Sequence, residues 1–493
     1  MANKDFAVLI LAAGKGTRLK SNLAKVLHRA GGRTLVEHVV AACGPLRAKS
    51  IHVVVGHQAD QVAAAIASTG AKTVLQQPQR GTGHAMLVAR RALGGAKHVL
   101  VLPGDAPLIR TETLQSLIRT HRDGAAAASI LTAVLADPSG YGRIIRRSDG
   151  RVAAIVEQSK LAENQLEINE INSSIYCFSL TKLWPAMARL KPDNVHRELY
   201  LTDAIALLAQ QDETVLAQIA PDSAEILGCN TRAELAEVDR VFRRRAAARW
   251  MDAGVSIQFP DTIVIDPDVS IGQDTVIEPN VQLLGSTRIG ADCVVRTGSV
   301  ISDCTIADGV IVKPYSILNA SRIAAAVQVG PFTHLREAAD LRENSRIGNF
   351  VEVKKSTIGA GAKAMHLSYL GDAKIGEKTN IGAGTITCNY DGVYKNPTTI
   401  GRGVFIGSDT ALVAPVRVGD GAYVGAGSVI TENVPADALA IARGRQANKP
   451  GWARKRRREF AASSSKAARS HRPRRAANKK AARAKRASRR KSR

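Results

Sequence analysis

The chain has 493 residues, and single hydrophobic cores stop growing at roughly 250–300 residues, so we expect at least two domains. Lys and Arg number 69 against 43 Asp and Glu, a formal net charge of +26 that points to a polyanionic partner. The excess is uneven, because residues 454–493 hold 19 basic residues and one acid, whereas residues 1–453 hold 50 basic and 42 acidic ones. An apolar content of 45% excludes global disorder.

Membrane and secreted classes are disfavoured by the sequence. No run reaches the ~18 apolar residues of a membrane span, and the N-terminus lacks the basic and apolar segments of a signal peptide. The six cysteines have no paired spacing, which disfavours a disulfide framework or a zinc site and favours free thiols. We therefore expect a cytoplasmic protein.

Residues 1–230 alternate between strand-like and helix-like segments. Apolar runs that end in Gly, Pro or Asp predict strands at 8–13, 51–55, 98–103 and 127–134, and helical spacing predicts helices at 34–43, 60–67 and 83–93. Buried strands joined by crossover helices are typical of a Rossmann-like, mostly parallel α/β sheet. Ligands bind such sheets at the carboxyl ends of the strands.

A helical arm is predicted next, over residues 231–253. Thr231 and Glu234 have the spacing of a capping box, and Leu235, Val238 and Val241 follow at helical spacing. The narrow apolar stripe suits a connector better than a core helix.

Residues 254–453 repeat an aliphatic residue every sixth position. A period of six places one aliphatic side chain inside each flat face of a parallel β-helix, whereas an amphipathic helix or an alternating strand cannot hold it. The repeat also explains the low aromatic content of 4%. The three series are Ile265, Ile271, Ile277, Leu283, Ile289, Val295 and Ile301; Ile306, Val312, Leu318, then Ile323, Val329, Leu335, Leu341, Ile347 and Val353; and Ile400, Ile406, Leu412, Val418, Val424 and Ile430.

Two departures from this repeat are expected to carry function. Residues 388–397 (CNYDGVYKNP) break the series and must bulge out as a loop. Residues 364–371 (AMHLSYLG) place His366 and Tyr369 where the repeat normally has small or short polar residues.

A glycine-rich turn follows the first predicted strand. Gly14 and Gly16 free backbone N–H groups to face an anion, and Arg18 and Lys25 add positive charge at the same mouth. The turn lacks the Gly-Lys-Ser/Thr ending of a P-loop, and Leu19 replaces the third Gly of a dinucleotide fingerprint. Taken alone, the turn is equally well explained as simple chain reversal.

Further polar residues converge on this edge of the sheet. Gln76 and residues 81–85 (GTGHA) form a second glycine-rich turn, and Asp105 projects from the end of the strand at 98–103. A carboxylate at that place suits Mg²⁺, which takes one or two carboxylates together with phosphate oxygens. The alternative is an aspartate that only caps a turn or a helix.

His366 is the candidate general base of the β-helix, because its unperturbed pKa lies near 6.5. The alternative is a corner histidine satisfied by the backbone. Three hexapeptides make one coil of 18 residues, so His366 and Gly384 should be neighbours on adjacent coils. Lys354, Glu352, Tyr369, Asn380, Asn389 and Tyr390 also fall on neighbouring coils.

These motifs carry a resemblance to known enzymes. The LxxGxGTRL run at 11–19, Lys25 within 23–27 and the Gly-Asp pair at 104–105 resemble the sugar-nucleotide pyrophosphorylases. With the hexapeptide domain and the run NIGAGTITCNYDG at 380–392, residues 5 to about 452 resemble the bacterial bifunctional family that makes UDP-N-acetylglucosamine, a precursor of peptidoglycan and lipopolysaccharide.

The resemblance implies an α/β nucleotidyltransferase domain, a helical arm and a left-handed, trimeric parallel β-helix with acetylation sites shared between subunits. The implied reactions are acetyl transfer from acetyl-CoA to glucosamine-1-phosphate, then Mg²⁺-dependent uridylyl transfer from UTP to N-acetylglucosamine-1-phosphate with release of pyrophosphate.

For uridylyl transfer, the resemblance implies that Arg18 and Lys25 face the phosphates and that Asp105 and Asn230 hold Mg²⁺. Pro103 departs from the family pattern, which often has Tyr there. The implied nucleotide and sugar contacts are Leu11, Ala12, Ala13, Gly14, Lys25, Gln76, Gly81, Thr82, Gly104, Asp105, Gly142, Glu157, Asn172 and Asn230.

For acetyl transfer, the resemblance implies that His366 deprotonates the amine of glucosamine-1-phosphate without a covalent intermediate. Glu337 departs from the family pattern, which usually has Pro after the Arg. The implied glucosamine-1-phosphate contacts are Arg336, Lys354, Tyr369 and Asn380, and the implied acetyl-CoA contacts are Ala383, Asn389, Tyr390, Ser408, Ala426 and Arg443.

Two alternatives remain. The chain could be a single-activity sugar-phosphate nucleotidyltransferase with a structural β-helix. It could also be a polyanion-binding protein that acts through residues 454–493, which alternate Lys or Arg with Ala and Ser and which we expect to be a disordered, solvated tail.

Overall fold

The computed structural model describes residues 3–192 and 197–470. It divides into two compact units, Met1–Ile441 and Ala442–Arg493, and each is described by itself. Within the described residues, no helix is both long and apolar enough to span a bilayer. Residues 471–493 of the predicted tail lie outside the described part.

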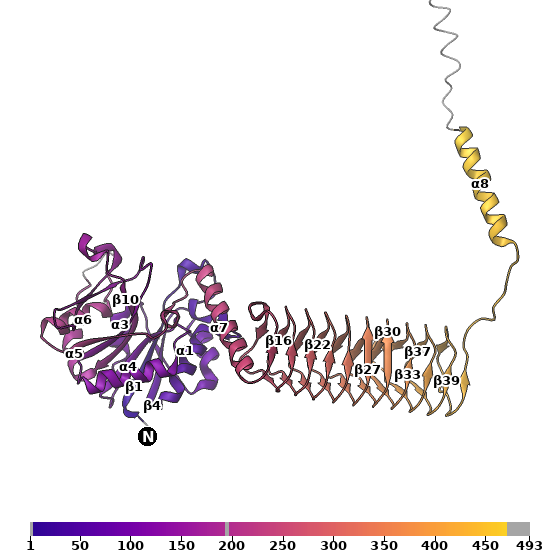
Figure 1. Ribbon diagram of the computed structural model, residues 1–493, viewed down its shortest axis with the longest axis horizontal. Helices are drawn as coiled ribbons and strands as arrows, with labels where there is room; N and C mark the ends of the chain where they lie inside the picture. The colour runs from indigo at the N-terminus through magenta and orange to yellow at the C-terminus, as the bar shows by residue number, and fades with distance from the viewer. Residues whose placement is uncertain (1–2, 193–196, 471–493) are drawn as a thin grey trace, which may run out of the picture. The chain divides into compact units, whose positions relative to one another are not determined.

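The N-terminal domain is built on a mixed sheet (Figure 1). The strand order is β11-β7-β10-β6-β1-β4-β5, with β8 paired to β10 and β9. β1 pairs in parallel with β4 and β6, whereas β10 is antiparallel to both β6 and β7. The bounds are β1 Asn3–Ala12, β4 Ala48–Val55, β5 Lys72–Leu75, β6 His98–Pro103, β7 Ala128–Val134, β8 Arg143–Arg146, β9 Val152–Val156, β10 Glu170–Ser179 and β11 Val215–Ile219, with a small hairpin of β2 Arg29–Ala30 and β3 Arg33–Thr34.

Helices cover both faces of this sheet. One core packs α1, α2 and α4 on the sheet through residues such as Val36, Val62 and Leu117, and the other packs α3, α5 and α6 through residues such as Met86 and Ile205. The bounds are α1 Leu35–Cys43, α2 Ala59–Ile66, α3 Thr82–Ala89, α4 Thr111–Asp123, α5 Leu180–Met187 and α6 Leu201–Gln210. The predicted Rossmann-like α/β fold is confirmed.

Helix α7 (Arg232–Asp252) follows the sheet domain. The Thr231 hydroxyl accepts the Glu234 N–H, which is half of the predicted capping box, but the Glu234 carboxylate accepts the N–H of Asn230 at 2.5 Å instead. The arm packs on the N-terminal domain, where Phe242 stacks on His38 with ring centroids 4.0 Å apart. It is joined to the β-helix by the Arg244–Asp261 ion pair at 2.7 Å.

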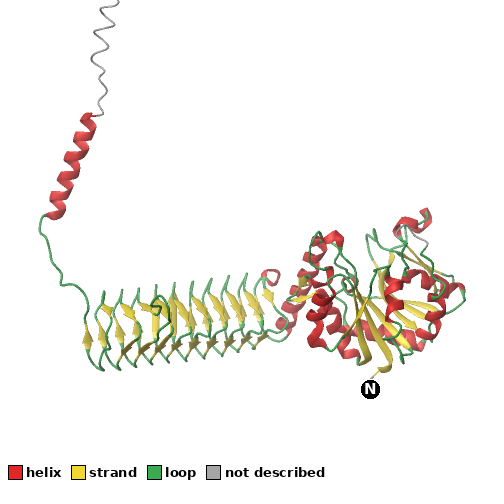
Figure 2. Cartoon of the chain, turned by 180° about the vertical axis from the view of Figure 1, so that it is seen from behind, coloured by secondary structure: helices red, strands yellow, loops and turns green. Residues whose placement is uncertain are grey.

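The hexapeptide region folds as a left-handed parallel β-helix with three sheets, as predicted (Figure 2). Every aliphatic residue of the three predicted series is buried in one continuous core. Sheet 1 contains β12 Ser256–Ile257, β15 Val276–Ile277, β18 Val294–Val295, β21 Ile311–Val312, β24 Gln328–Val329, β27 Arg346–Asn349, β30 Lys363–His366, β33 Asn380–Ile381, β36 Phe405–Ile406, β39 Tyr423–Val424 and β41 Leu439–Ala440.

The other two sheets complete each coil. Sheet 2 contains β13 Val264–Ile265, β16 Gln282–Leu284, β19 Val300–Ser302, β22 Ile317–Asn319, β25 His334–Arg336, β28 Glu352–Lys354, β31 Tyr369–Gly371, β34 Ile386–Cys388, β37 Ala411–Val413 and β40 Val429–Ile430. Sheet 3 contains β14 Ser270–Ile271, β17 Arg288–Ile289, β20 Thr305–Ile306, β23 Arg322–Ile323, β26 Asp340–Leu341, β29 Thr357–Ile358, β32 Ala373–Ile375, β35 Thr398–Ile400 and β38 Val416–Val418.

The predicted loop interrupts the stacking of the coils. Ala373 pairs with Thr398, an offset of 25 residues, whereas Thr357 pairs with Lys374 at an offset of 17. The extra residues lie between β34 and β35, and the side chain of Asp391 holds them together by accepting the N–H groups of Val393 and Tyr394. The loop therefore has a defined structure of its own.

The basic tail departs from the expectation of disorder over part of its length. Helix α8 spans Trp452–Ser470, beyond the last strand of the β-helix. Ala, Arg and Lys are strong helix formers, so a segment rich in them forms a helix without a core to pack on.

Candidate active sites

A cavity of about 950 Å³ opens at the carboxyl ends of β1 and β6, where the parallel sheet predicts a ligand site. Gly104 donates its N–H to the Leu11 carbonyl oxygen at 2.8 Å, which joins the end of β1 to the loop that follows β6. Of the predicted nucleotide and sugar contacts, the cavity is lined by Leu11, Ala12, Ala13, Gly14, Lys25, Gln76, Gly81, Thr82, Asp105, Gly142, Glu157 and Asn172. Arg18, Gly104 and Asn230 are placed just outside the lining.

The first glycine-rich turn needs Gly16 for two reasons. Its φ of +63° lies in the left-handed region, and a Cβ there would stand 2.4 Å from the Cβ of Lys25. The close approach of Lys25 to the turn thus depends on the absence of a side chain at position 16.

Lys25 is at the centre of a charged cluster. Its ammonium contacts a carboxylate oxygen of Asp105 and donates to the Oδ1 of Asn230 at 2.7 Å. Arg18 donates to the same Asn230 oxygen, also at 2.7 Å. The cluster joins residues of two loops to Asn230, which directly precedes the arm. Among the described residues, no group of three or more His, Cys, Asp or Glu is gathered for a metal ion.

The second glycine-rich turn is fixed by buried side chains. Gln76 is only 3% exposed and donates to the Gly81 carbonyl oxygen at 3.0 Å. The Thr82 hydroxyl accepts the N–H of Leu201 at 3.0 Å, so the start of α3 is joined to the start of α6. This connection forms one wall of the cavity.

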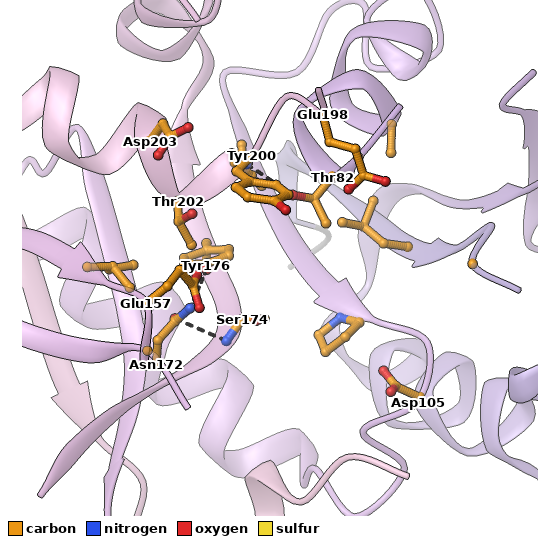
Figure 3. Close-up of a pocket in the computed structure, with 18 of the residues that line it drawn as sticks. Thr82, Asp105, Glu157, Asn172, Ser174, Tyr176, Glu198, Tyr200, Thr202 and Asp203 are labelled. Atoms are coloured by element: carbon orange, nitrogen blue, oxygen red, sulfur yellow. Dashed lines mark hydrogen bonds between the residues drawn. The ribbon is translucent and has the colours of Figure 1, made fainter. Parts of the chain in front are cut away.

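Asp105 lies on the opposite side of the cavity from Glu157 and Asn172 (Figure 3). Asn172 donates to the Tyr176 hydroxyl at 2.9 Å and accepts the N–H of Ser174 at 3.1 Å, so its amide is held in one orientation. Partial desolvation, and then the charge of Asp203, raise the pKa of Glu157 even though its side chain remains open to the cavity. This end of the cavity carries Glu157, Asp203 and Lys160, whereas Lys25 lies at the opposite end with Asp105.

Several lining residues were missed by sequence reasoning. Tyr141, Ser174, Tyr176, Glu198, Tyr200, Thr202 and Asp203 all face the cavity. Ser174 and Tyr176 come from β10, Glu198 and Tyr200 from the segment before α6, Thr202 and Asp203 from α6, and Tyr141 from the loop before β8. None of these elements was predicted, so no sequence signal placed the residues at the carboxyl edge.

In the β-helix, the predicted proximity of His366 and Gly384 is confirmed, because the Gly384 N–H donates to the His366 carbonyl oxygen at 3.4 Å. The His366 Nδ1 lies 2.7 Å from the Oδ1 of Asn349, its register partner on the preceding coil. An amide oxygen accepts only, so this contact assigns the proton to Nδ1 and leaves Nε2 free to accept one. Asn349 was not among the predicted residues.

The column that contains His366 continues along the β-helix with small residues. The Asp409 N–H donates to the Ala383 carbonyl oxygen, and the Gly427 N–H donates to that of Ser408, so Ala383, Ser408 and Ala426 follow His366 on successive coils. Three of the predicted acetyl-CoA contacts therefore share one column with the candidate base.

A cationic cluster lies on neighbouring coils of sheet 2. Arg336 and Lys354 are register partners, and Lys354 is within 3.4 Å of the Glu337 carboxylate. A hydrogen bond to the Lys354 ammonium and the repulsion between the two charges lower the pKa of Lys395, which comes from the inserted loop. Lys395 was missed because its approach to Lys354 depends on how that loop folds back.

The remaining predicted acetyl-site residues are divided. Asn389 donates to the Asp372 carboxylate at 2.5 Å and to the Tyr369 hydroxyl at 3.4 Å. Tyr390 is 61% exposed on the loop. Asn380 lies on sheet 1 as the register partner of Lys363, away from sheet 2, and Arg443 lies in the second compact unit.

Three family models match parts of the chain: the MobA-like NTP transferase domain over residues 8–202, the GMPPB C-terminal domain over 259–343 and six repeats of the bacterial transferase hexapeptide over 397–432. The bifunctional protein GlmU of Koribacter versatilis is 53% identical over 93% of this chain and 98% of its own length. The chain belongs to the GlmU family.

Other GlmU proteins match over the same extent. Those of Solibacter usitatus and Mycobacterium tuberculosis are 50% and 46% identical over 92% of this chain, and over 98% and 93% of their own lengths. Because GlmU proteins align with both the sheet domain and the β-helix, the resemblance seen in the sequence is confirmed for the whole enzyme. The alternative of a nucleotidyltransferase with a merely structural β-helix is not supported.

Proposed function

We propose that the chain is a bifunctional transferase of UDP-N-acetylglucosamine synthesis. It acetylates glucosamine-1-phosphate with acetyl-CoA and then transfers a uridylyl group from UTP to N-acetylglucosamine-1-phosphate. The observation that carries the proposal is the end-to-end relation to GlmU proteins. Each of the two domains so aligned also has a polar cluster suited to one of the reactions.

For uridylyl transfer, the cavity binds the nucleotide beside the two glycine-rich turns and the sugar beside Glu157 and Asn172. Lys25 and Arg18 carry positive charge to the phosphates, which stabilises the charge that develops as the sugar phosphate attacks the α-phosphate and pyrophosphate leaves.

The donor set around Lys25 fits a hard divalent cation. Oxygens of Asp105 and Asn230 both contact the Lys25 ammonium, so they already converge on one positive charge. Mg²⁺ takes one or two protein oxygens and completes its shell with phosphate oxygens and water. Asp105 and Asn230 would hold Mg²⁺, which supplies Lewis-acid stabilisation of phosphate charge when bound.

For acetyl transfer, the Nε2 of His366 accepts a proton from the substrate amine. The amine nitrogen forms a bond to the thioester carbonyl carbon, and the carbon–sulfur bond breaks to release the coenzyme A thiolate. Asn349 holds the Nδ1–H and so keeps the ring in the tautomer that can act as a base. Lys354, Lys395 and Arg336 supply charge for the sugar phosphate.

The β-helix is also proposed to form a trimer. Tyr315, Phe332, Phe350 and Leu367 occupy successive positions of the corner between sheets 1 and 2, are 47–61% exposed, and all have a φ above +50°. A bulky residue in the left-handed region costs about 1–2 kcal/mol, and the other two corner columns carry Gly, Asp, Asn, Ala, Lys and Glu instead.

The three aromatic rings stack with centroids 5.6 and 5.3 Å apart, and the column ends at Leu367, directly beside His366. Such a strained apolar ladder is retained where another copy covers it. A neighbouring copy at this corner would also bring residues of sheet 1, such as Asn380, to the acetyl site. Sedimentation equilibrium should give three chains of 52.4 kDa, and the Phe332→Ser, Phe350→Ser variant should sediment as a monomer.

A coupled assay tests the function directly. The protein is given glucosamine-1-phosphate, acetyl-CoA, UTP and Mg²⁺, and formation of UDP-N-acetylglucosamine is followed. His366→Ala should abolish acetylation but use N-acetylglucosamine-1-phosphate normally. Undiminished acetylation by this variant, or failure of the unmodified chain to produce the nucleotide sugar, would overturn the proposal.

A further inference from the structure

Helix α8 presents a strongly basic surface, and the proposed function does not use it. The last residue placed in either candidate site is Arg443, whereas α8 spans Trp452–Ser470. Residues 454–493 carry 19 of the 69 basic residues and only one acid, Glu459. A segment that the catalytic chemistry does not need, and that adds most of the net charge, requires its own explanation.

The cations of α8 are not confined to one side. Residues 454–458 are five consecutive Arg or Lys residues, and an α-helix turns once in 3.6 residues, so they encircle the axis. All five are exposed. Glu459 is paired with one of them, Arg456, at 3.2 Å. The helix therefore presents positive charge in every direction.

This arrangement does not suit a membrane surface. A helix that lies in a bilayer interface needs a continuous apolar face opposite its basic face. The large apolar side chains of α8 are Trp452 and Phe460, which are 60% and 59% exposed, and the Arg456 guanidinium lies over the Phe460 ring at 4.8 Å. A cationic helix with no apolar face is instead matched to a partner that surrounds it with anions.

Arginine predominates among these cations. Of the 19 basic residues in 454–493, 13 are Arg and 6 are Lys. The guanidinium group binds phosphate oxygens with two parallel hydrogen bonds, which the ammonium group cannot do. A regular phosphate backbone is the polyanion that uses this preference, because its charges recur along a groove that admits an α-helix.

We propose that helix α8 binds nucleic acid through the phosphate backbone, without sequence preference. The enzyme is thereby held on a nucleic acid by a segment that lies beyond the last residue placed in either candidate site. The inference does not rest on the proposed function, because it concerns a segment outside both candidate sites.

Binding is tested with the full-length protein and a fluorescein-labelled DNA duplex or single-stranded RNA of about 20 nucleotides, by anisotropy between about 50 and 200 mM KCl. If the five cations at 454–458 each neutralise a phosphate, they add about 4.5 to the slope of log affinity against log salt on the duplex and about 3.5 on the single strand. The affinity then falls about 500-fold on the duplex and about 130-fold on the single strand across this range. Truncation after Trp452 should weaken binding at least about 100-fold and leave both catalytic activities unchanged.

A charge-matched pair of variants separates this helix from general positive charge. Replacing Arg454, Lys455, Arg457 and Arg458 by Gln keeps the Arg456–Glu459 pair and the helix propensity, and should lower the salt slope by about 3 to 4. Replacing the exposed sheet 3 residues Arg288, Arg322, Lys374 and Arg417 by Gln removes the same charge and should change the slope by less than about 1.

Three results would overturn the proposal. The truncated chain could bind DNA and RNA as tightly as the full chain, the sheet 3 variant could lose as much affinity as the α8 variant, or the full chain could bind phosphatidylserine vesicles but neither nucleic acid. Circular dichroism of the α8 variant shows whether the helix is retained. With the helix retained, a lower salt slope is caused by the lost charges and not by unfolding of α8. Because both enzymatic activities are measured in the same preparations, failure of this inference is distinguishable from failure of the proposed function.

Discussion

Gly348→Ala should disable acetyl transfer without touching the substrate site. Gly348 lies in β27, and a Cβ built on it would stand 1.9 Å from the carbonyl oxygen of Met365 in β30. Its φ lies outside the left-handed region, so alanine is tolerated by the local backbone and the fault is purely steric. The atom in the way is backbone, which cannot rotate aside as a side chain can.

The size of the displacement follows from this distance. Real Cβ contacts are essentially never below 3.0 Å, so the two strands must move apart by about 1.1 Å at this point. Met365 directly precedes His366, so the shift is passed to the candidate base and to its contact with Asn349. A misplacement of about 1 Å costs about 100-fold in rate, so acetyl transfer should fall about 100-fold.

Acetylation of glucosamine-1-phosphate and uridylylation of N-acetylglucosamine-1-phosphate are measured separately on the same preparation. The control is Gly272→Ala, whose Cβ would stand 2.4 Å from backbone atoms of the next coil but far along the β-helix from His366. Both variants should lower the melting temperature, whereas only Gly348→Ala should lose acetyl transfer. Acetylation within about threefold of the unmodified rate in a folded Gly348→Ala protein would refute the reasoning.

Three further predictions address a base, a metal and a pH response. Asn349→Ala should lower the kcat of acetyl transfer about 10-fold or more. Asn349→Asp keeps an acceptor for the Nδ1–H of His366, but its negative charge favours the imidazolium form. This variant should therefore move the acidic limb of the pH profile of acetylation to higher pH. Asp105→Asn should lower uridylyl transfer by at least about 100-fold and weaken its Mg²⁺ dependence, with acetyl transfer as the unaffected internal control. Burial lowers the pKa of His121 to about 4, so unfolding takes up a proton between about pH 6.5 and pH 4. The free energy of unfolding should therefore fall by about 3 kcal/mol as the pH drops through that window. Urea denaturation across this range should show a flatter pH dependence for His121→Gln, and an unchanged slope would contradict the assignment.

The sheet domain shows what local sequence determines. β1, β4 and β6 were predicted because strands buried on both faces appear as uninterrupted aliphatic runs. β10 was missed, because its sequence EINSSIYCFS mixes polar and apolar residues and because it runs antiparallel between two strands that are far from it in the chain. Ser174 and Tyr176 of β10, and Glu198 and Tyr200 before α6, line the cavity, and their place there could not be derived without the tertiary pairing.

The charged cluster around Lys25, at the other end of the cavity, could be predicted only in part from the sequence, for the same reason. Lys25 and Asp105 each follow a predicted strand, and the carboxyl ends of parallel strands share one edge, so their proximity follows from the fold class. Asn230 comes from the loop before α7, and nothing in its surroundings marks it as a ligand. Its place beside Lys25 was suggested by resemblance alone, and it depends on the packing of the arm against the sheet domain.

The β-helix shows a different limit, because the coil at His366 is one residue shorter than the 18 residues that the repeat predicts. A coil of three perfect hexapeptides has 18 residues, and that offset places Gly348 beside His366. The observed offset is 17, because the repeat loses one residue after Val353, and Asn349 takes the place instead. A backbone N–H in a parallel ladder reaches the carbonyl one residue behind its register partner, so Gly384, 18 residues on, still bonds to the His366 carbonyl oxygen. The prediction for Gly348→Ala depends on this same slip: at an offset of 17 its Cβ meets Met365 and displaces the strand of His366, whereas at 18 it would meet His366 itself.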